Sequence, residues 1–387
     1  MAKVLLVDTN FSATPIYQAL QSAGHEVHVV GGNPRDCLAK AASRYWQLDY
    51  SDTTALAALI DAQGFDFIVP GCTDRSYASC VAAGRDRFPG IDAPHAMEAI
   101  NHKARFREVA ARLDLPVPQV FTDPEAVRGS PLIVKPVDAF SGKGITVIRE
   151  SSGAEMAKAI EHARSISPSG EFLLEEYVEG QLYSHSAFIC GQRVIQDFMV
   201  REDGSANPFV VDTSHVLQDE SILLQTLRQH IETLAAELDL VDGLVHTQFI
   251  AGKDGVRLIE ATRRCPGDLY SQLIELSTGF PYAEAYAQPF LGQQISARAM
   301  GPSRPVLRHT ITVPTAQNLA HVSFRRPLAI ERWVSLGLIG DRLHPSPAGR
   351  IAVIFCIEPN PEALADLYQC ALRRELYTVV DCYASPA

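Results

Sequence analysis

The sequence predicts an α/β protein, α+β overall, with an open parallel sheet at its N-terminus. The chain has 387 residues, of which 47% are hydrophobic and 20% are charged, which suffices for two or three domains with buried cores. Short apolar runs alternate with helical stretches through residues 1–100, as in doubly wound sheets. Later apolar runs are joined by glycine-containing turns, which indicates hairpins and antiparallel strands.

The first hundred residues carry three apolar strands and two helices between them. The first turn, residues 8–13, lacks the G-x-G-x-x-G pattern, which disfavours a dinucleotide site. We therefore expect an open α/β domain that forms one wall of a cleft. The expected elements are strands Val4–Val7, His25–Val30 and Phe65–Pro70, with helices Pro15–Ala23 and Thr54–Gln63.

After the first hundred residues, a helix is expected from about residue 103. It ends before two prolines, Pro116 and Pro118. These prolines indicate a rigid connection between domains. A glycine turn between two strands follows, which is a hairpin and not the strand–loop–helix of a P-loop. The expected elements are strands Leu132–Lys135 and Ile145–Arg149, helix Ala154–Arg164, strands Phe172–Val178 and Tyr183–Ile189, helix Ser221–Leu238, the hairpin of Leu244–Ile250 with Val256–Glu260, strands Pro305–Pro314 and Gly349–Ile357, and helix Pro361–Leu376.

Charge and cysteine usage exclude several classes of protein. The net charge is −11, which argues against nucleic acid and anionic membranes as general partners. The eight cysteines show no zinc-site spacing and are expected to be free thiols in a reducing compartment. No leader segment and no run of 18 apolar residues is present, so we expect a cytoplasmic location and no transmembrane span.

Charged residues stand at the ends of several apolar runs, and the segment 258–268 is the most informative. There Glu260 ends an apolar run, and Arg263 and Arg264 follow. A carboxylate at the end of a buried strand requires a cation, and paired arginines suit phosphate or carboxylate ligands. A cluster of surface ion pairs would have the same composition, and Arg263 with Asp268 could form such a pair.

The order of these residues resembles the ATP-grasp superfamily of carboxylate–amine ligases, with the L-amino-acid ligases as the closest branch. The resemblance rests on two lysines, a Gly-Lys-Gly loop, a Glu-Glu-Tyr-Val strand end and Glu260, in this order over residues 1–290. It implies an N-terminal pre-ATP-grasp domain (1–100), a two-lobed ATP-grasp domain (101–290, with a lid at about 120–180) and a C-terminal mixed α/β subdomain (291–387).

By this resemblance the middle region binds ATP. Lysines act as point charges against phosphates, and backbone N–H groups of a glycine loop can close over them. The implied phosphate ligands are Lys103 and Lys135, and the implied glycine-rich loop that closes over the phosphates is Ser141, Gly142, Lys143 and Gly144. The implied adenine contacts are Glu175 and the backbones of Glu176 and Val178.

The resemblance also implies a site for Mg²⁺ or Mn²⁺ on two strands. Glu260 is a suitable hard-oxygen ligand, whereas Gln248 and Thr262 stand where the family usually has an acid and an asparagine. Leu182 likewise stands where the family often has an acid that binds ribose. We expect a weaker or single-metal site in which phosphate oxygens supply more of the coordination.

The implied substrate pocket contains Asp212, His215 and Arg264. Asp212 would bind a substrate ammonium, Arg264 a carboxylate, and His215 would lie near the acyl phosphate. Lys143, Arg201 and Arg308 are further candidates for anion contacts.

The resemblance implies an ADP-forming ligase that makes an amide or peptide bond through an acyl phosphate, with an amino-acid-like carboxylate as the expected substrate. A ligase for a non-amino-acid acid or amine, and a degenerate nucleotide-binding module without turnover, stay open as alternatives. The expected partners are small-molecule carboxylates and amines, and the oligomeric state is left open, a homodimer included.

Overall fold

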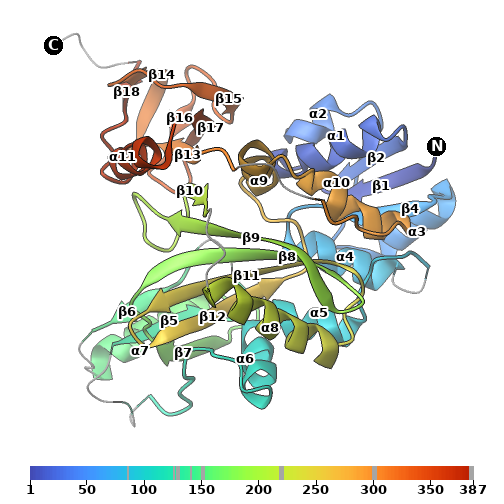
Figure 1. Cartoon of the computed structure of the whole chain (residues 1–387), viewed down its shortest axis with the longest axis horizontal. Helices are drawn as coiled ribbons and strands as arrows, with labels where there is room; N and C mark the ends of the chain where they lie inside the picture. Colours follow the sequence, from blue (N-terminus) through green and yellow to red (C-terminus); the bar gives the residue numbers. More distant parts are fainter. Residues whose placement is uncertain are drawn as a thin grey trace.

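The computed structural model describes residues 1–84, 87–124, 127, 131–139, 142–149, 153–217, 222–298 and 303–382. The N-terminal domain is an open parallel sheet in the order β3-β2-β1-β4, as the alternating pattern predicts (Figure 1). Strand β1 is buried over Val4–Val7 because helices cover both faces of such a sheet. The elements of this domain are β1 (Lys3–Val7), η1 (Phe11–Ala13), α1 (Thr14–Ser22), β2 (Glu26–Gly31), α2 (Cys37–Ala41), β3 (Tyr45–Gln47), α3 (Thr53–Gln63), β4 (Phe67–Pro70) and α4 (Asp74–Gly84).

Two helices, α5 (Pro94–Asn101) and α6 (Lys103–Arg112), connect this domain to a small three-stranded sheet with the order β6-β5-β7. Both pairings are antiparallel, so the glycine turn before β6 does close a hairpin. Helix α7 packs on this sheet around a separate apolar core. The elements of this subdomain, which covers the expected lid at about 120–180, are β5 (Leu132–Pro136), β6 (Thr146–Ile148), α7 (Gly153–Ile166) and β7 (Phe172–Glu176).

The centre of the molecule is an eight-stranded sheet with the order β12-β11-β8-β9-β10-β13-β17-β15. The pairing of β10 with β13 carries this sheet across residue 290, where a subdomain boundary was expected. The C-terminal strands therefore extend the central sheet. Its strands are β8 (Gln181–Cys190), β9 (Arg193–Asp203), β10 (Thr213–Val216), β11 (Gly243–Gly252), β12 (Gly255–Thr262), β13 (Val306–Thr312), β15 (Ile330–Ser335) and β17 (Arg350–Ile357).

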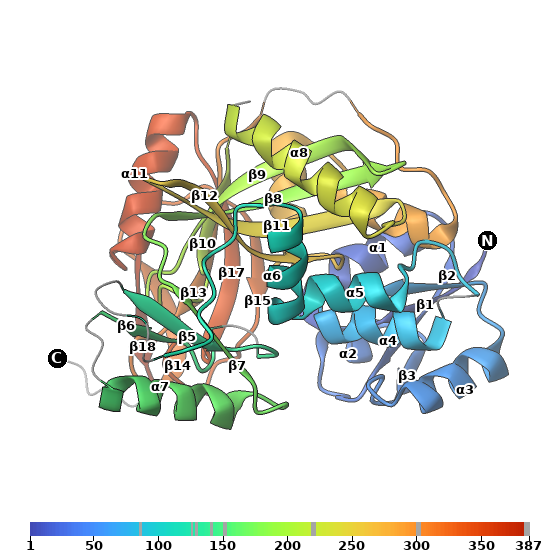
Figure 2. The same ribbon diagram turned by 90° about the horizontal axis from the view of Figure 1, so that it is seen from below.

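Helices cover the two faces of the central sheet differently. Helix α8 (Ile222–Glu237) lies across one face together with α5 and α6, as Figure 2 shows, and these elements share one apolar core. On the other face α9 (Tyr270–Thr278), α10 (Tyr282–Ala287) and η2 (Gln288–Leu291) pack in a core that also contains the N-terminal domain.

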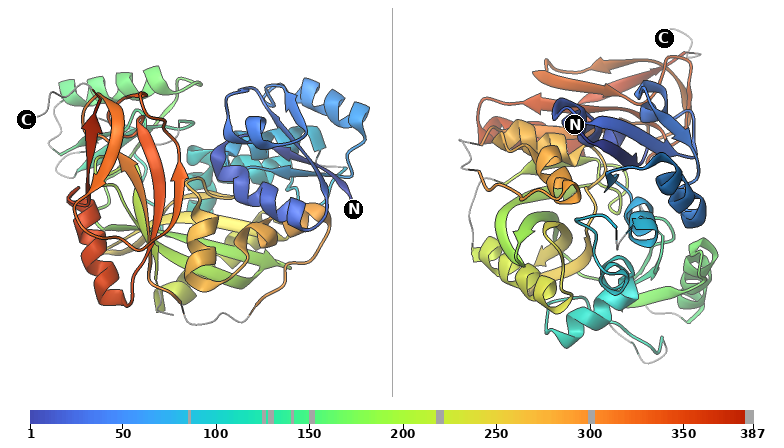
Figure 3. Two further views of the ribbon diagram at one scale, coloured as in Figure 1. Left: turned by 90° about the horizontal axis from the view of Figure 1, so that it is seen from above. Right: turned by 90° about the vertical axis from the view of Figure 1, so that its right-hand side faces the viewer.

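The rest of the C-terminal region is a second small sheet, of order β16-β14-β18, and one helix. Figure 3 shows this region and the N-terminal domain at separate ends of the molecule. The remaining elements are β14 (Gln317–Phe324), β16 (Arg342–Leu343), α11 (Pro361–Leu372) and β18 (Tyr377–Asp381). Among the described residues no helix is long and apolar enough to cross a membrane.

Candidate active site

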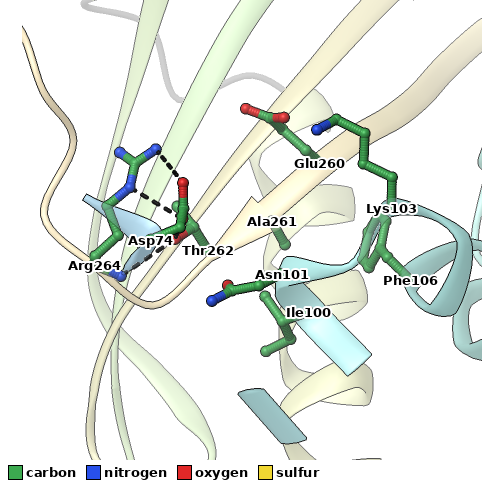
Figure 4. Close-up of a pocket in the computed structure, with 9 residues that line it drawn as sticks. All are labelled: Asp74, Ile100, Asn101, Lys103, Phe106, Glu260, Ala261, Thr262 and Arg264. Atoms are coloured by element: carbon green, nitrogen blue, oxygen red, sulfur yellow. Dashed lines mark hydrogen bonds and ion pairs between the residues drawn. The ribbon is translucent and has the colours of Figure 1, made fainter. Parts of the chain in front are cut away.

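A small pocket lies where α4, α5, α6 and β12 meet (Figure 4). The side chains of Lys103 and Glu260 point toward one another across it. Lys103 is placed by its helix, because the preceding His102 accepts a hydrogen bond from Arg105 N and so starts α6 there. The pocket is lined by Asp74, Ile100, Asn101, Lys103, Phe106, Glu260, Ala261, Thr262 and Arg264.

Lys103 also connects the pocket to the lid. Its ammonium group donates a hydrogen bond to the carbonyl of Ala139, 3.0 Å away, in the segment that follows β5. Two residues singled out in the sequence, Lys103 and Glu260, therefore lie at one site, beside the lid.

Lys135 lies in the lid, in a buried cluster of three charges. Strands β5 and β7 place Lys135 and Glu175 as diagonal neighbours on one face, with Lys135 Nζ 2.5 Å from Glu175 Oε2. Arg107 on α6 donates through Nε to Glu175 Oε1, also at 2.5 Å, and through Nη2 to the carbonyl of Ile259 at 2.9 Å. This cluster holds two cations and one carboxylate.

The electrostatics of this cluster favour an incoming anion. Burial lowers the pKa of Lys135 to about 8, although the carboxylate of Glu175 acts in the opposite direction. Burial alone would raise the pKa of Glu175, but the charges of Lys135 and Arg107 outweigh it and lower that pKa. A buried positive charge in excess of its carboxylate partner is costly, and a phosphate group would neutralise it.

The expected adenine contacts are altered by these interactions. The carboxylate of Glu175 is only 1% exposed and is engaged by Lys135 and Arg107, so it is not presented to a ligand. The N–H of Glu176 donates to the carbonyl of Gln119 at 2.9 Å and is likewise taken. Val178 follows β7 and is half-buried.

The glycine loop lies between β5 and β6, and Ser141 falls outside the described residues. Gly142 has φ of 69°, a left-handed conformation that favours glycine, and a Cβ there would lie 2.9 Å from the carbonyl oxygen of Phe209. Gly144 has φ of 74°, and Lys143 between them is exposed. The loop therefore approaches the β9–β10 connection too closely for a side chain at Gly142.

Gln248 and Glu260 are cross-strand partners on β11 and β12, so their side chains leave the same face of the central sheet. Ser184 on β8 is the next partner in this row. Both Gln248 and Ser184 donate hydrogen bonds to Glu202 on β9, Gln248 Nε2 to Oε2 at 2.7 Å and Ser184 Oγ to Oε1 at 2.9 Å. Glu202 is 5% exposed, and burial raises its pKa to about 7.

Thr262 and Arg264 both contact Asp74, the first residue of α4. Thr262 Oγ1 donates to Asp74 Oδ1 at 2.8 Å, and Arg264 binds both carboxylate oxygens, at 3.1 and 3.2 Å. Burial would raise the pKa of Asp74, but the guanidinium of Arg264 lowers it overall. The hydroxyl proton of Thr262 is thus committed to Asp74, and Arg264 already holds one carboxylate of the chain.

His215 lies on the opposite face of the central sheet from Gln248 and Glu260. It is the partner of Arg201 on β9, which is the partner of Tyr183 on β8. Tyr183 adjoins Ser184, the partner of Gln248, and neighbouring residues in a strand point to opposite faces. The ring of His215 packs edge-on against Tyr368 of α11, and burial lowers its pKa.

The carboxylate of Asp212 is also engaged within the chain. It accepts from the N–H and hydroxyl of Ser205 and from the hydroxyl of Thr213, and it is 4% exposed. Arg264 lines the pocket with Lys103 and Glu260, whereas Asp212 and His215 are not among its lining residues. The substrate pocket that the resemblance implies from these three residues stays a prediction.

Arg263 does not pair with Asp268. It binds the buried carboxylate of Asp92 through Nε at 2.6 Å. This ion pair joins the segment before α5 to the residue that follows β12. Asp268 instead lies 3.4 Å from Arg308, which is 2% exposed, and its carbonyl accepts from Arg308 Nε. Arg201 pairs with Asp203.

Three residues of the site were missed in the sequence, namely Asp74, Arg107 and Glu202. Asp74 is the first residue of helix α4, where an acid is common because it interacts favourably with the helix dipole. Arg107 falls within an amphipathic helix, and Glu202 within the Arg-Glu-Asp end of a strand. None carries a local signal that distinguishes it from a surface charge, because its partners are distant in sequence.

Comparison with known proteins was made on sequence and on fold. Residues 128–272 match the model of the ATP-grasp domain family. The chain is 28% identical over 293 residues to the phosphoribosylamine–glycine ligase of Pyrococcus furiosus, with 68% of this chain and 66% of that protein covered. It thus spans slightly less than two thirds of that relative's length.

Two crystal structures share the fold over nearly their whole length. The L-amino acid ligase from Bacillus licheniformis has a TM-score of 0.80 at 16% identity, with 98% of this chain and 99% of that one covered. Phosphoribosylglycinamide synthetase from Anaerococcus prevotii has a TM-score of 0.76 at 15% identity, with the same coverage. The predicted fold class is confirmed.

Proposed function

This chain belongs to the ATP-grasp superfamily, and from that premise we propose that it is an ATP-dependent carboxylate–amine ligase that releases ADP. The observation that carries the proposal is the buried cluster of Arg107, Glu175 and Lys135, whose excess positive charge adjoins a pocket lined by Lys103 and Glu260. A polyphosphate with its cation suits this arrangement of charges.

The phosphates of ATP would lie between Lys135 and Lys103, covered by the glycine loop that contains Gly142 and Gly144. Because the carboxylate of Glu175 is engaged by cations, we assign the adenine contact to main-chain groups of residues 175–178. Lys103, hydrogen-bonded to Ala139, would help to draw the lid over the nucleotide.

The residues present fit a cation that is shared with the nucleotide. Among the residues that the structure describes, no group of three or more His, Cys, Asp or Glu side chains could hold a metal alone. Glu260 and the amide oxygen of Gln248 offer two hard oxygens from one face, and Mg²⁺ commonly takes one or two carboxylates plus phosphate oxygens and water. Bound there, Mg²⁺ or Mn²⁺ would offset the negative charge of the phosphates.

In the proposed reaction, a substrate carboxylate oxygen attacks the γ-phosphorus of ATP and ADP leaves. An amine then attacks the carbonyl carbon of the acyl phosphate, phosphate leaves with the C–O bond electrons, and the amine loses a proton to give the amide. Lys135 stabilises charge on the transferred phosphoryl group. Arg264 would exchange Asp74 for the substrate carboxylate, since both offer two oxygens to its planar fork.

We propose an amino-acid-like substrate, which the names of the ligases from Pyrococcus furiosus and Bacillus licheniformis support. A nucleotide-binding module without turnover is the second candidate. The observation that favours it is the neutral Gln248 on β11, at a position where the family usually has an acid that binds the metal.

The test is ADP release by the purified protein with ATP, Mg²⁺ and pools of amino acids and other carboxylates and amines, with mass-spectrometric detection of products. Amine-dependent ADP release with a condensed product supports the ligase. The control is Glu108→Gln, which alters an exposed carboxylate on α6 that pairs with surface Arg105. ATP binding without ADP release in every pool would contradict the ligase and favour the module.

A further inference from the structure

Glu202 lies beside the proposed metal ligands, although it belongs to none of the sequence motifs. It is buried on β9 and accepts one hydrogen bond from Gln248 Nε2, at 2.7 Å, and one from Ser184 Oγ, at 2.9 Å. Ser184 is in turn 2.9 Å from the hydroxyl of Tyr270, so this side of the carboxylate is held by a buried network. Two donors therefore fix the position of the Glu202 side chain.

The hydrogen bond sets the direction of the Gln248 amide. Because Nε2 of Gln248 donates to Glu202 Oε2, the NH₂ group of the amide faces Glu202. The amide oxygen then points away from β9. Glu260 is the cross-strand partner of Gln248 on its other side, on β12. The amide oxygen is thus directed toward the side of Gln248 where the Glu260 carboxylate lies.

We propose that Glu202 is a positioning residue that presents the amide oxygen of Gln248, together with the Glu260 carboxylate, to the cation of MgATP. This inference rests on the proposed function, because it concerns the cation that would accompany ATP. Positioning groups of this kind typically account for about 10–100-fold in metal affinity.

The same contact explains why a glutamine stands at position 248. A carboxylate there would meet the Glu202 carboxylate at hydrogen-bond distance, and like charges so close repel. The acid and the amide are therefore a matched pair on β9 and β11, in which Glu202 accepts the hydrogen bond and Gln248 donates it and keeps its amide oxygen for the cation.

The experiment measures Mn²⁺ binding by electron paramagnetic resonance with a non-hydrolysable ATP analogue, and affinity for the analogue alone in EDTA. Glu202→Met removes the acceptor at similar size. We expect it to raise the Kd of Mn²⁺ about tenfold and to change analogue affinity in EDTA by less than about twofold. Glu108→Gln is the surface control and should change neither value.

The pair exchange gives the stronger test. In the double variant Glu202→Gln with Gln248→Glu, the amide donates from β9 and the carboxylate stands on β11, so Mn²⁺ should bind at least as tightly as in the native protein. Gln248→Glu alone should lower the midpoint of thermal unfolding, and the double variant should restore it. A structural role for Glu202 alone would not produce this rescue of metal binding.

Two results would overturn the inference while leaving the proposed function intact. One is an unchanged Kd of Mn²⁺ in Glu202→Met when Glu260→Gln abolishes binding. The other is a double variant that binds Mn²⁺ no better than Glu202→Met, or, if that protein does not fold, no better than Glu202→Gln. Failure of the native protein to bind the analogue even in EDTA would instead refute the proposed function, and the inference with it.

Discussion

Lys135 should make nucleotide affinity depend on pH in a range where ATP itself no longer titrates. Burial lowers the pKa of this lysine to about 8, so its charge is lost in the free protein as the pH rises through that value. Phosphates stabilise the ammonium form, and the pKa of Lys135 must therefore be higher in the complex. Binding above pH 8 then takes up a proton, and affinity falls as the pH rises.

The size of the effect follows from the pKa. At pH 9, one unit above it, only about a tenth of the free protein carries the charge, so affinity should be roughly tenfold lower than at pH 7, or about 1.4 kcal/mol. Proton uptake on binding should rise from near zero at pH 7 to about 0.9 per site at pH 9.

The assay is calorimetric titration with a non-hydrolysable ATP analogue in EDTA, in pairs of buffers with different ionisation enthalpies. Lys135→Met should bind about one to two decades more weakly at pH 7, because charge-assisted contacts contribute about 1.5–3 kcal/mol, and its affinity should vary little with pH. Native affinity that is constant from pH 7 to 9, without proton uptake, would refute the assignment of Lys135 to the phosphates.

Three further substitutions test other contacts. Glu175→Gln leaves two buried cations without their carboxylate and should lower the free energy of unfolding in urea by about 3–5 kcal/mol; a loss below about 1 kcal/mol would contradict the buried cluster. Asp92→Asn should lower the free energy of unfolding by a similar amount, because it leaves the buried guanidinium of Arg263 without its carboxylate. The affinity for the ATP analogue, measured at a temperature where the variant is folded, should be unchanged. Glu260→Gln should lower ADP formation at least about 100-fold with analogue affinity in EDTA kept within twofold, and normal turnover at limiting Mg²⁺ would exclude Glu260 as the ligand.

The parts of the fold that were predictable are those whose signal is local. Apolar runs located β1, β5 and β17 to within one or two residues, because a buried strand must be apolar along its own length. Strand β15 was missed, since it is an edge strand whose residues are mostly half-exposed or exposed. Its extended form is stabilised by pairing with β17, which no local pattern reports.

The site divides in the same way. Lys103 and Glu260 were selected because they belong to an ordered set of residues, and the structure places them in one pocket. Asp212 and His215 were selected by resemblance to an acid-x-x-His segment of the L-amino-acid ligases. In a strand a shift of one residue reverses the face of a side chain, so spacing without register cannot tell which face a histidine occupies. Glu202 has no signal of its own, because its role depends on β8 and β11 beside it.

Arg107 shows how the fold joins the two halves of the site. Its Nε binds the Glu175 carboxylate of the lid, and its Nη2 binds the carbonyl of Ile259, one residue before Glu260 on β12. A phosphate bound by Lys135 would weaken that lysine's interaction with Glu175 and leave the carboxylate to Arg107. Since Arg107 also binds β12, one residue before Glu260, this change in charge would occur next to the proposed metal ligand. The buried cluster therefore connects the proposed phosphate site to the backbone of Glu260, and no motif along the sequence specifies this contact between α6, β7 and β12.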